Sequence, residues 1–227
     1  MLFALRLLVK ILLGFVALSL VLVAIFRFLP VPVTATMLMD ENGMTKDWEP
    51  LSRIDRNMVR AVIAAEDGKF CSHNGFDKEA IEKAIERNAK VLAGGKGVIR
   101  GGSTISQQTA KNVFLWQGGG FIRKGLEAWF TFLIENIWGK RRIMEVYLNV
   151  AETGIGTYGV EAGAQRYYKH SATRLSAIEA ARMAAALPLP KARSVVNPTG
   201  FTRRYGNTIA ARIGVVRRDG LDSCVYE

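Results

Sequence analysis

Residues 100–112 read RGGSTISQQTAKN, and this stretch predicts a helix with one polar face. Thr104 and Gln107 have the spacing of a capping box, which predicts a helix that runs through Lys111. On such a helix Thr104, Gln108 and Lys111 share one face, because they stand at i, i+4 and i+7. The glycine pair enters a helix start rich in hydroxyl groups, which is a natural site for an anionic oxygen. An ordinary capped surface helix is the simpler alternative.

The sequence on both sides of this stretch also reads as helical, and signals for strands are few. Asp55 is a predicted N-cap, and Ser176 with Glu179 forms a second capping box. Apolar residues stand on nearly every face between Arg123 and Trp138, as in a helix that is deeply buried or in contact with lipid. We expect a mainly α domain. One helix begins after Asp55, three cover residues 78–92, 123–138 and 140–149, and another begins after Ser176 and ends at Pro188.

The N-terminus reads as a membrane anchor. Residues 11–26 (ILLGFVALSLVLVAIF) span about 24 Å as a helix, and residues 7–29 reach the ~30 Å of a hydrocarbon core. The apolar stretch is long for a cleaved signal peptide, and no A-x-A pattern follows it, which favours a retained helix. Arg6 and Lys10 precede the span and Arg27 follows it, so we expect the N-terminus inside and the domain outside the cytoplasm.

The composition supports a single anchored domain. Hydrophobic residues make up 49% of the 227 residues, which excludes a disordered chain, and only one segment is long enough to cross a membrane. We divide the chain into an anchor (1–29), a linker (30–50) and a domain (51–227). Beyond residue 29 the chain holds 28 basic and 20 acidic residues, a net charge of +8 that suits a lipid surface or a phosphate-bearing substrate. Nucleic acid does not fit a domain outside the cytoplasm. Cys71 and Cys224 are too few for a disulfide framework, and the sequence leaves their pairing open.

Residues 66–77 (EDGKFCSHNGFD) bring acidic groups and a histidine to the end of an apolar helix. A carboxylate that is partly desolvated there has a raised pKa and acts as a better base, and the neighbouring Asp67 raises the pKa of Glu66 further. A solvated helix end and a structural histidine are the alternative. The spacing matches no standard set of metal ligands.

Two further motifs carry charge. Arg123 and Glu127 in RKGLE stand four residues apart, so a structural ion pair is the default interpretation. Residues 140–149 (KRRIMEVYLN) add cations and another glutamate, and packing of this helix against the core explains most of the pattern.

Together the four motifs resemble those of the peptidoglycan glycosyltransferases of family 51. Their order along the chain also matches: 66–77, 100–112, 123–127 and 140–149. The resemblance runs from about Leu51 to Arg204 and implies a helical, lysozyme-like fold. No Ser-x-x-Lys of a transpeptidase occurs, so the chain resembles the monofunctional, membrane-anchored type. The resemblance implies that lipid-linked disaccharide-pentapeptide is polymerised into β-1,4 glycan strands with release of polyprenyl diphosphate and inversion at the reacting carbon.

The resemblance also assigns roles to residues. Glu66 is the expected general base and Glu127 the second catalytic glutamate. The expected substrate-binding residues are Asp67, Phe70, His73, Arg100, Ser103, Thr104, Gln108, Lys111, Asn112, Arg123 and Lys124. No cofactor is required, although a divalent cation, Mg or Mn, could assist on the diphosphate, and the sequence assigns no metal ligands. Relatives often have an arginine where this chain has Gly118–Gly120, so one cation on the donor diphosphate is missing or is replaced by Arg123.

Three further expectations follow. The partners are the lipid-linked precursor, the growing glycan strand, the membrane and other proteins of wall synthesis or division. The expected location is the inner (cytoplasmic) membrane, with the domain on the periplasmic side. The alternatives are a membrane-bound lytic enzyme, which needs an acid beside the glycosidic oxygen, and a wall-binding scaffold that does not require Glu66.

Overall fold

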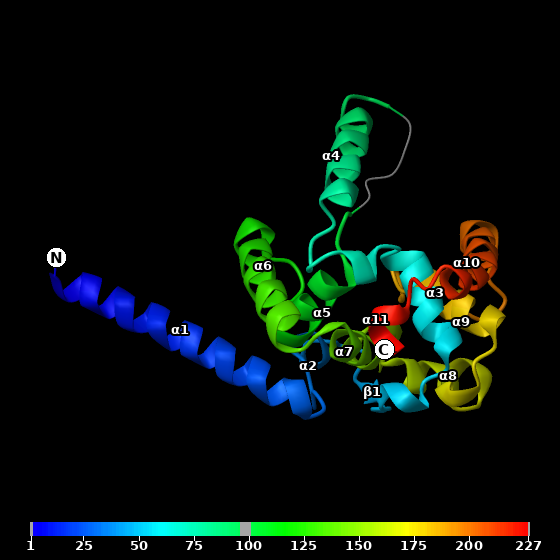
Figure 1. The fold of residues 1–227 in the computed structure, drawn as a ribbon, viewed down its shortest axis with the longest axis horizontal. Coiled ribbons are helices and arrows are strands. Elements are labelled where there is room, and N and C mark those ends of the chain that lie inside the picture. Colours follow the sequence, from blue (N-terminus) through cyan, green and yellow to red (C-terminus); the bar gives the residue numbers. More distant parts are fainter. Residues whose placement is uncertain (1, 96–100, 227) are drawn as a thin grey trace.

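The computed structural model describes residues 2–95 and 101–226, and these residues confirm the mainly α prediction (Figure 1). The α-helices are α1 (Leu2–Phe28), α2 (Ala35–Leu38), α3 (Arg56–Glu66), α4 (Lys78–Leu92), α5 (Ile105–Phe114), α6 (Gly120–Ile137), α7 (Lys140–Val150), α8 (Val160–Tyr168), α9 (Ala177–Ala186), α10 (Gly200–Arg218) and α11 (Ser223–Tyr226). The short 3-10 helices are η1 (Leu51–Arg53), η2 (Phe70–Ser72) and η3 (Ala172–Arg174), and the strands are β1 (Thr45–Lys46), β2 (Glu152–Gly154) and β3 (Thr157–Tyr158).

The predicted caps begin the helices that the sequence indicates. The Asp55 carboxylate accepts the backbone N–H of Asn57 at 2.8 Å, and Thr104 and Ser176 each form a complete capping box. Such caps satisfy N–H groups that the first turn of a helix leaves without partners. Helix α5 continues three residues beyond the predicted end at Lys111, to Phe114.

Helix α6 begins at Gly120, three residues before the predicted start. Gly119 has a φ of 85°, and a Cβ there would lie 2.9 Å from Cβ of Arg123 and 3.1 Å from Nε1 of Trp116. Only glycine fits this turn without strain, because other residues rarely adopt the left-handed conformation. The glycine loop that departs from the family pattern therefore forms the tight entry to α6.

The core lies where α3, α9 and α10 pack together and where α5 lies between α6 and α7. The buried face of α9 consists mostly of alanines, which let α3 and α10 approach closely. Helix α4 projects from the body (Figure 1), and none of its residues is fully buried.

The segment 30–50, expected to be a linker, packs on the domain. Val31 and Met37 are buried, and β1 pairs in parallel with β3 in a small sheet of order β1-β3-β2. The Tyr158 hydroxyl donates to Asp40 at 2.7 Å across this junction. The segment therefore belongs to the folded unit.

Helix α1 extends from one end of the body and packs against α6 only near its own C-terminal half (Figure 1). It is 27 residues long and apolar enough to cross a membrane by length and composition. Phe15 lies edge-to-face with Phe130, and the Trp138 indole N–H donates to the Val23 carbonyl at 2.7 Å. Most apolar side chains in the N-terminal part of α1 are exposed, as a lipid-facing helix requires.

A disulfide joins Cys71 of η2 to Cys224 of α11, which settles a question that the sequence leaves open. The Cα atoms are 5.5 Å apart, within the range that a disulfide spans. Two further contacts dock the same C-terminal segment: Arg60 pairs with Asp222 at 2.8 Å, and Arg141 donates to the Val225 carbonyl at 2.9 Å. These contacts hold the C-terminal segment 222–225 against the segment that follows Glu66.

Replacing both cysteines by serine should destabilise the domain. The cross-link joins residues 153 apart in sequence, so its loss should lower the free energy of unfolding by about 2–4 kcal/mol. Chemical denaturation of the detergent-solubilised protein measures this change, and wild type under reductant is the matched control. A double variant as stable as the oxidised wild type would contradict the prediction.

Candidate active site

Glu66 is the last residue of α3, and its side chain is largely buried. Oε2 accepts a hydrogen bond from Nε2 of Gln108 on α5 at 2.9 Å. Oε1 is enclosed and has no hydrogen-bond partner among the residues that the structure describes. Burial raises the pKa of Glu66, and Asp67 adds to this effect, while Gln108, Arg193 and Lys111 oppose it. The prediction that the pKa of Glu66 is raised is therefore confirmed.

Asp67 joins the end of α3 to the start of α5. Its carboxylate accepts the backbone N–H of Ile105 at 3.0 Å and faces Nε2 of His73 at 3.0 Å. The other ring nitrogen of His73 accepts the N–H of Gly75 at 3.1 Å, so Nε2 carries the proton and donates to Asp67. These bonds hold the loop after Glu66 against the N-terminus of α5.

Gly75 and Thr104 complete the same junction. The Thr104 hydroxyl donates to the Gly75 carbonyl at 2.6 Å and also caps α5. A Cβ at Gly75 would lie 2.7 Å from Cγ2 of Thr131, and the φ of 90° also favours glycine. The loop can therefore approach α6 closely only with glycine at this position.

A group of charged side chains surrounds Glu127 on α6. Glu127 is only 2% exposed, and Nη1 of Arg123 contacts one of its oxygens at 2.6 Å. Lys124 pairs with the other oxygen and also donates to the hydroxyl of Ser103 at 3.3 Å. The i, i+4 ion pair expected from the sequence is present. We call Lys111, Arg123, Lys124 and Glu127 the α5–α6 charge cluster.

Lys111 interacts electrostatically with both glutamates, Glu66 and Glu127. Burial lowers its pKa, and the charges of Glu127 and Glu66 oppose that change. The α5–α6 charge cluster holds three basic groups against one acid, an excess of positive charge that suits a diphosphate. A pocket of about 210 Å³ opens beside it and is lined by Gln108, Lys111, Asn112, Tyr147 and Glu152, among others.

In the structure, the predicted site residues fall into two groups according to their contacts. Asp67, Phe70, His73 and Thr104 are held in the scaffold by protein contacts, and Phe70 is fully buried, so their role as direct substrate ligands stays a prediction. The predicted residues that gather around Glu66, the α5–α6 charge cluster and the pocket are Ser103, Gln108, Lys111, Asn112, Arg123, Lys124 and Glu127. Arg100 lies outside the described residues.

Sequence reasoning missed two residues that interact electrostatically with Glu66. Tyr147 is fully buried, its hydroxyl lies 3.5 Å from Oε1 of Gln108, and the charge of Glu66 helps to raise its pKa. Arg193 acts on Glu66 through its positive charge. Tyr147 falls within a predicted motif and could have been proposed, whereas nothing local marks Arg193.

In residues 2–95 and 101–226, no three His, Cys, Asp or Glu side chains are grouped so as to hold a metal ion. Both oxygens of Glu127 already contact cationic side chains. Asp67 is likewise bound by a backbone N–H and His73. These carboxylates therefore offer a metal few open positions.

Comparison with known proteins identifies the family. The Transglycosylase family model matches residues 34–213. A protein of Caulobacter vibrioides named biosynthetic peptidoglycan transglycosylase is 51% identical over 97% of this chain and 95% of its own length. Proteins of the same name from Rhodospirillum centenum and Pseudomonas syringae are 44% and 46% identical, over 98% and 90% of this chain and 96% and 89% of theirs.

The chain belongs to the transglycosylase family. The match begins within the segment 30–50, which agrees with the packing of that segment on the domain.

Replacing Gln108 by leucine should shift the pH dependence of glycan polymerisation. The variant loses the N–H donor to Glu66, and this bond favours the carboxylate, so the pKa of Glu66 should rise further. A hydrogen bond to a charged group contributes about 1.5–3 kcal/mol, which corresponds to about one to two pH units. The acidic limb of the rate profile should move to higher pH. Gln165→Leu, at an exposed position of α8 outside the pocket, should keep the wild-type limb, and an unmoved limb in Gln108→Leu would refute the assignment.

Replacing Lys111 by alanine should slow polymerisation and leave the fold intact. A lysine contact to an anionic substrate contributes about 1.5–3 kcal/mol, which is roughly a ten- to hundredfold loss of rate. Initial rates and circular dichroism of the variant check both parts. Lys90→Ala on the exposed helix α4 serves as the control. A near-normal rate with an unchanged spectrum would remove Lys111 from the site.

Proposed function

We propose that this protein polymerises lipid-linked disaccharide-pentapeptide into β-1,4 glycan strands for cell wall synthesis and releases polyprenyl diphosphate. The observation that best supports this function is the position of Glu66. This largely buried glutamate has a raised pKa and interacts with the cationic α5–α6 charge cluster. The curated relatives are named biosynthetic peptidoglycan transglycosylases, and the match covers nearly the whole chain.

Glu66 acts as the general base. A sugar hydroxyl is a poor nucleophile at neutral pH and needs a base within hydrogen-bond reach. Oε2 is held by Gln108, which leaves Oε1 as the oxygen that takes the proton from the 4-hydroxyl of the acceptor N-acetylglucosamine. An enclosed and unpaired carboxylate oxygen is unfavourable, and the incoming hydroxyl supplies the missing hydrogen bond.

The α5–α6 charge cluster serves the donor. The acceptor oxygen attacks C1 of the donor N-acetylmuramic acid, the bond from C1 to the diphosphate oxygen breaks, and the configuration inverts. The leaving diphosphate gains negative charge, so it needs positive charge around it more than it needs a proton. Lys111, Arg123 and Lys124 supply that charge, and Glu127 holds the latter two in place.

The reaction as proposed requires no cofactor. Arg123 and Lys124 occupy both oxygens of Glu127, so these side chains take the place that a divalent cation would fill at this carboxylate. A magnesium or manganese ion bound to the diphosphate itself is the alternative, and titration of the rate with EDTA and each metal distinguishes the two.

The domain is proposed to work on the periplasmic side of the inner membrane. Helix α1 provides the anchor, and Phe121 and Ile122 at the start of α6 are 96% and 80% exposed. Helix α6 lies on the side of the body from which α1 extends (Figure 1). The disulfide between Cys71 and Cys224 suits an oxidising compartment. The membrane and its lipid-linked substrates are the proposed partners, and other wall-synthesis or division proteins stay an expectation.

Incubation of the full-length protein with lipid-linked monomer tests the function. Polymer with release of polyprenyl diphosphate supports it. Fragments from added glycan would indicate a lytic enzyme, and no reaction at all would favour a wall-binding scaffold.

Replacing Glu66 by glutamine should remove most of the activity. Glutamine keeps the shape of the side chain but cannot accept a proton, and general-base catalysis contributes roughly 10²–10⁴-fold. The loss should persist at saturating monomer, because proton removal belongs to the transition state. The wild-type rate should fall as the pH drops through the raised pKa of Glu66, since protonated Glu66 is not a base.

The residual activity of Glu66→Gln should lack this acidic limb. Glu127→Gln is the matched comparison, and it should also weaken donor binding. A Glu66→Gln variant that polymerises at close to the wild-type rate would place the base elsewhere.

A further inference from the structure

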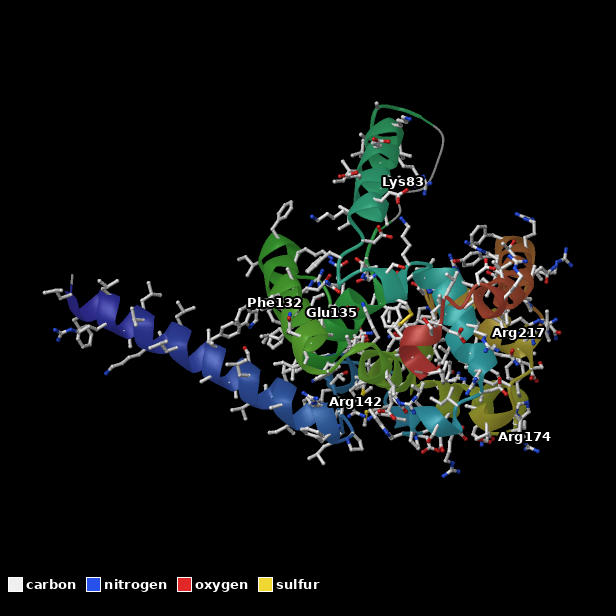
Figure 2. The ribbon with its side chains drawn as sticks, viewed as in Figure 1. Lys83, Phe132, Glu135, Arg142, Arg174 and Arg217 are labelled. Atoms are coloured by element: carbon white, nitrogen blue, oxygen red, sulfur yellow. A yellow bond between two sulfur atoms is a disulfide. The ribbon has the colours of Figure 1, made fainter. Side chains whose placement is uncertain are left out.

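A buried carboxylate on α6 joins this helix to α5 and α7. Glu135 lies on the side of α6 that faces the rest of the domain, and its side chain is 6% exposed (Figure 2). Its Oε1 atom accepts a hydrogen bond from the hydroxyl of Ser106 on α5. The same oxygen contacts Nζ of Lys140, the first residue of α7, at 2.6 Å. We call Ser106, Glu135 and Lys140 the Glu135 group.

The Glu135 group also contacts the loop that follows Glu66. Nζ of Lys140 lies 4.7 Å from the ring centroid of Phe70, which is fully buried. A cation over an aromatic face is attracted to the ring. A Cβ at Gly75 would lie 3.0 Å from Cγ of Glu135, so this loop lies directly against the glutamate side chain. The group therefore bears on both elements that meet at the Glu66 hydrogen bond, the loop and α5.

Two carboxylates hold adjacent residues at the start of α5. Asp67 accepts the backbone N–H of Ile105 at 3.0 Å, and Glu135 accepts the hydroxyl of Ser106. The first carboxylate follows α3 and the second lies on α6, so the start of α5 is held by two different elements. Gln108 stands two residues after Ser106, and its Nε2 donates to Glu66 at 2.9 Å. A shift of the first turn of α5 would therefore move this donor relative to Glu66.

Stability alone does not explain why the Glu135 group is charged. The side chains of Lys140 and Glu135 are 13% and 6% exposed, so both charges have lost most of their water. Apolar side chains of similar size are often as stabilising as a buried ion pair. Charge-assisted hydrogen bonds, in contrast, demand short distances and defined directions. One oxygen that takes donors from α5 and from α7 fixes the positions of these two helices relative to α6.

We propose that Glu135 is a positioning residue for the reaction, and that its carboxylate holds the start of α5, and with it Gln108, at the correct distance from Glu66. Ser106 is the contact through which Glu135 acts on α5, and Lys140 fixes the direction of the carboxylate. This inference rests on the proposed polymerisation, in which Glu66 is the base.

Loss of Glu135 should change the pH dependence of polymerisation through Gln108. The hydrogen bond from Gln108 lowers the pKa of Glu66, so a misplaced Gln108 leaves that pKa higher and moves the acidic limb to higher pH. A direct effect of charge has the opposite sign, because removal of a negative charge lowers the pKa of a nearby carboxyl group. The variants retain the titratable and charged groups that interact electrostatically with Glu66 from neighbouring positions, which are Asp67 after α3, Lys111 on α5, Tyr147 on α7 and Arg193 after α9.

Rates measured across a range of pH test the proposal. Full-length wild type, Glu135→Gln and Ser106→Ala are each incubated in membranes with lipid-linked disaccharide-pentapeptide. Glu135→Gln should lower the rate at saturating monomer about tenfold, since a small misplacement of reacting groups is costly. Its acidic limb should move to higher pH by about one unit, and by no more than the limb of Gln108→Leu. Glu86→Gln, at an exposed position of α4, is the matched control.

Ser106→Ala keeps the ion pair between Glu135 and Lys140 and should move the limb less, in the same direction. It tests the role even where Glu135→Gln folds poorly. A double variant separates positioning from a general loss of structure. Glu135→Gln combined with Gln108→Leu should move the limb little further than Gln108→Leu alone, because both changes act through the same hydrogen bond.

An acidic limb at the wild-type pH in both Glu135→Gln and Ser106→Ala would overturn the positioning role, whatever the rate. A full further shift in the double variant, or an equal shift in Glu86→Gln, would also overturn it. A wild-type protein that makes no polymer would instead overturn the proposed function, on which this role depends.

Discussion

The site depends on the carboxylate of Asp67, which is not the proposed base. Asp67 accepts hydrogen bonds from the backbone N–H of Ile105 at the N-terminus of α5 and from the Nε2–H of His73, and these bonds join the end of α3 to the start of α5. The positive end of the α5 dipole favours a negative charge there. Glu66 precedes Asp67, and Gln108 stands three residues after Ile105. The same junction therefore fixes the distance between Glu66 and its hydrogen-bond donor Gln108.

Charge and burial oppose each other across this arrangement. Removal of water raises the pKa of Glu66 and lowers the pKa of Lys111, and the attraction between the two residues limits both changes. A buried carboxylate with several cations nearby can remain ionised and still be a stronger base than an exposed one. Glu127 is more completely paired, since Arg123 and Lys124 take both of its oxygens. The two glutamates thus have different surroundings and suit different tasks.

Short-range features were predictable from the sequence, and long-range contacts were not. The caps at Asp55, Thr104 and Ser176 depend on neighbours within three residues, so their helices were predicted correctly. The segment 30–50 looks like a linker because its partner strand β3 lies more than 110 residues further on. The motifs indicated which charged residues gather near Glu66. They could not show that Asp67 and His73 serve the scaffold, that Gln108 contacts Glu66, or that the charge of Arg193 acts on Glu66. Those facts depend on how α3, α5 and the α9–α10 loop pack.

The anchor is docked on the domain as well as joined to it. Arg142 on α7 donates to the Phe26 carbonyl at 3.0 Å and also to that of Leu29, and so satisfies carbonyl groups that the end of α1 leaves without partners. Tyr147, whose hydroxyl lies 3.5 Å from Oε1 of Gln108, stands five residues further along α7, about 7.5 Å along the helix axis. One helix therefore contacts both the end of the anchor and Gln108, the residue that donates to Glu66. In the proposed reaction, the lipids hold both substrates so that their reacting atoms lie at a height above the membrane set by the diphosphate. An enzyme whose base is fixed at one height relative to its own anchor meets them with little further loss of conformational freedom.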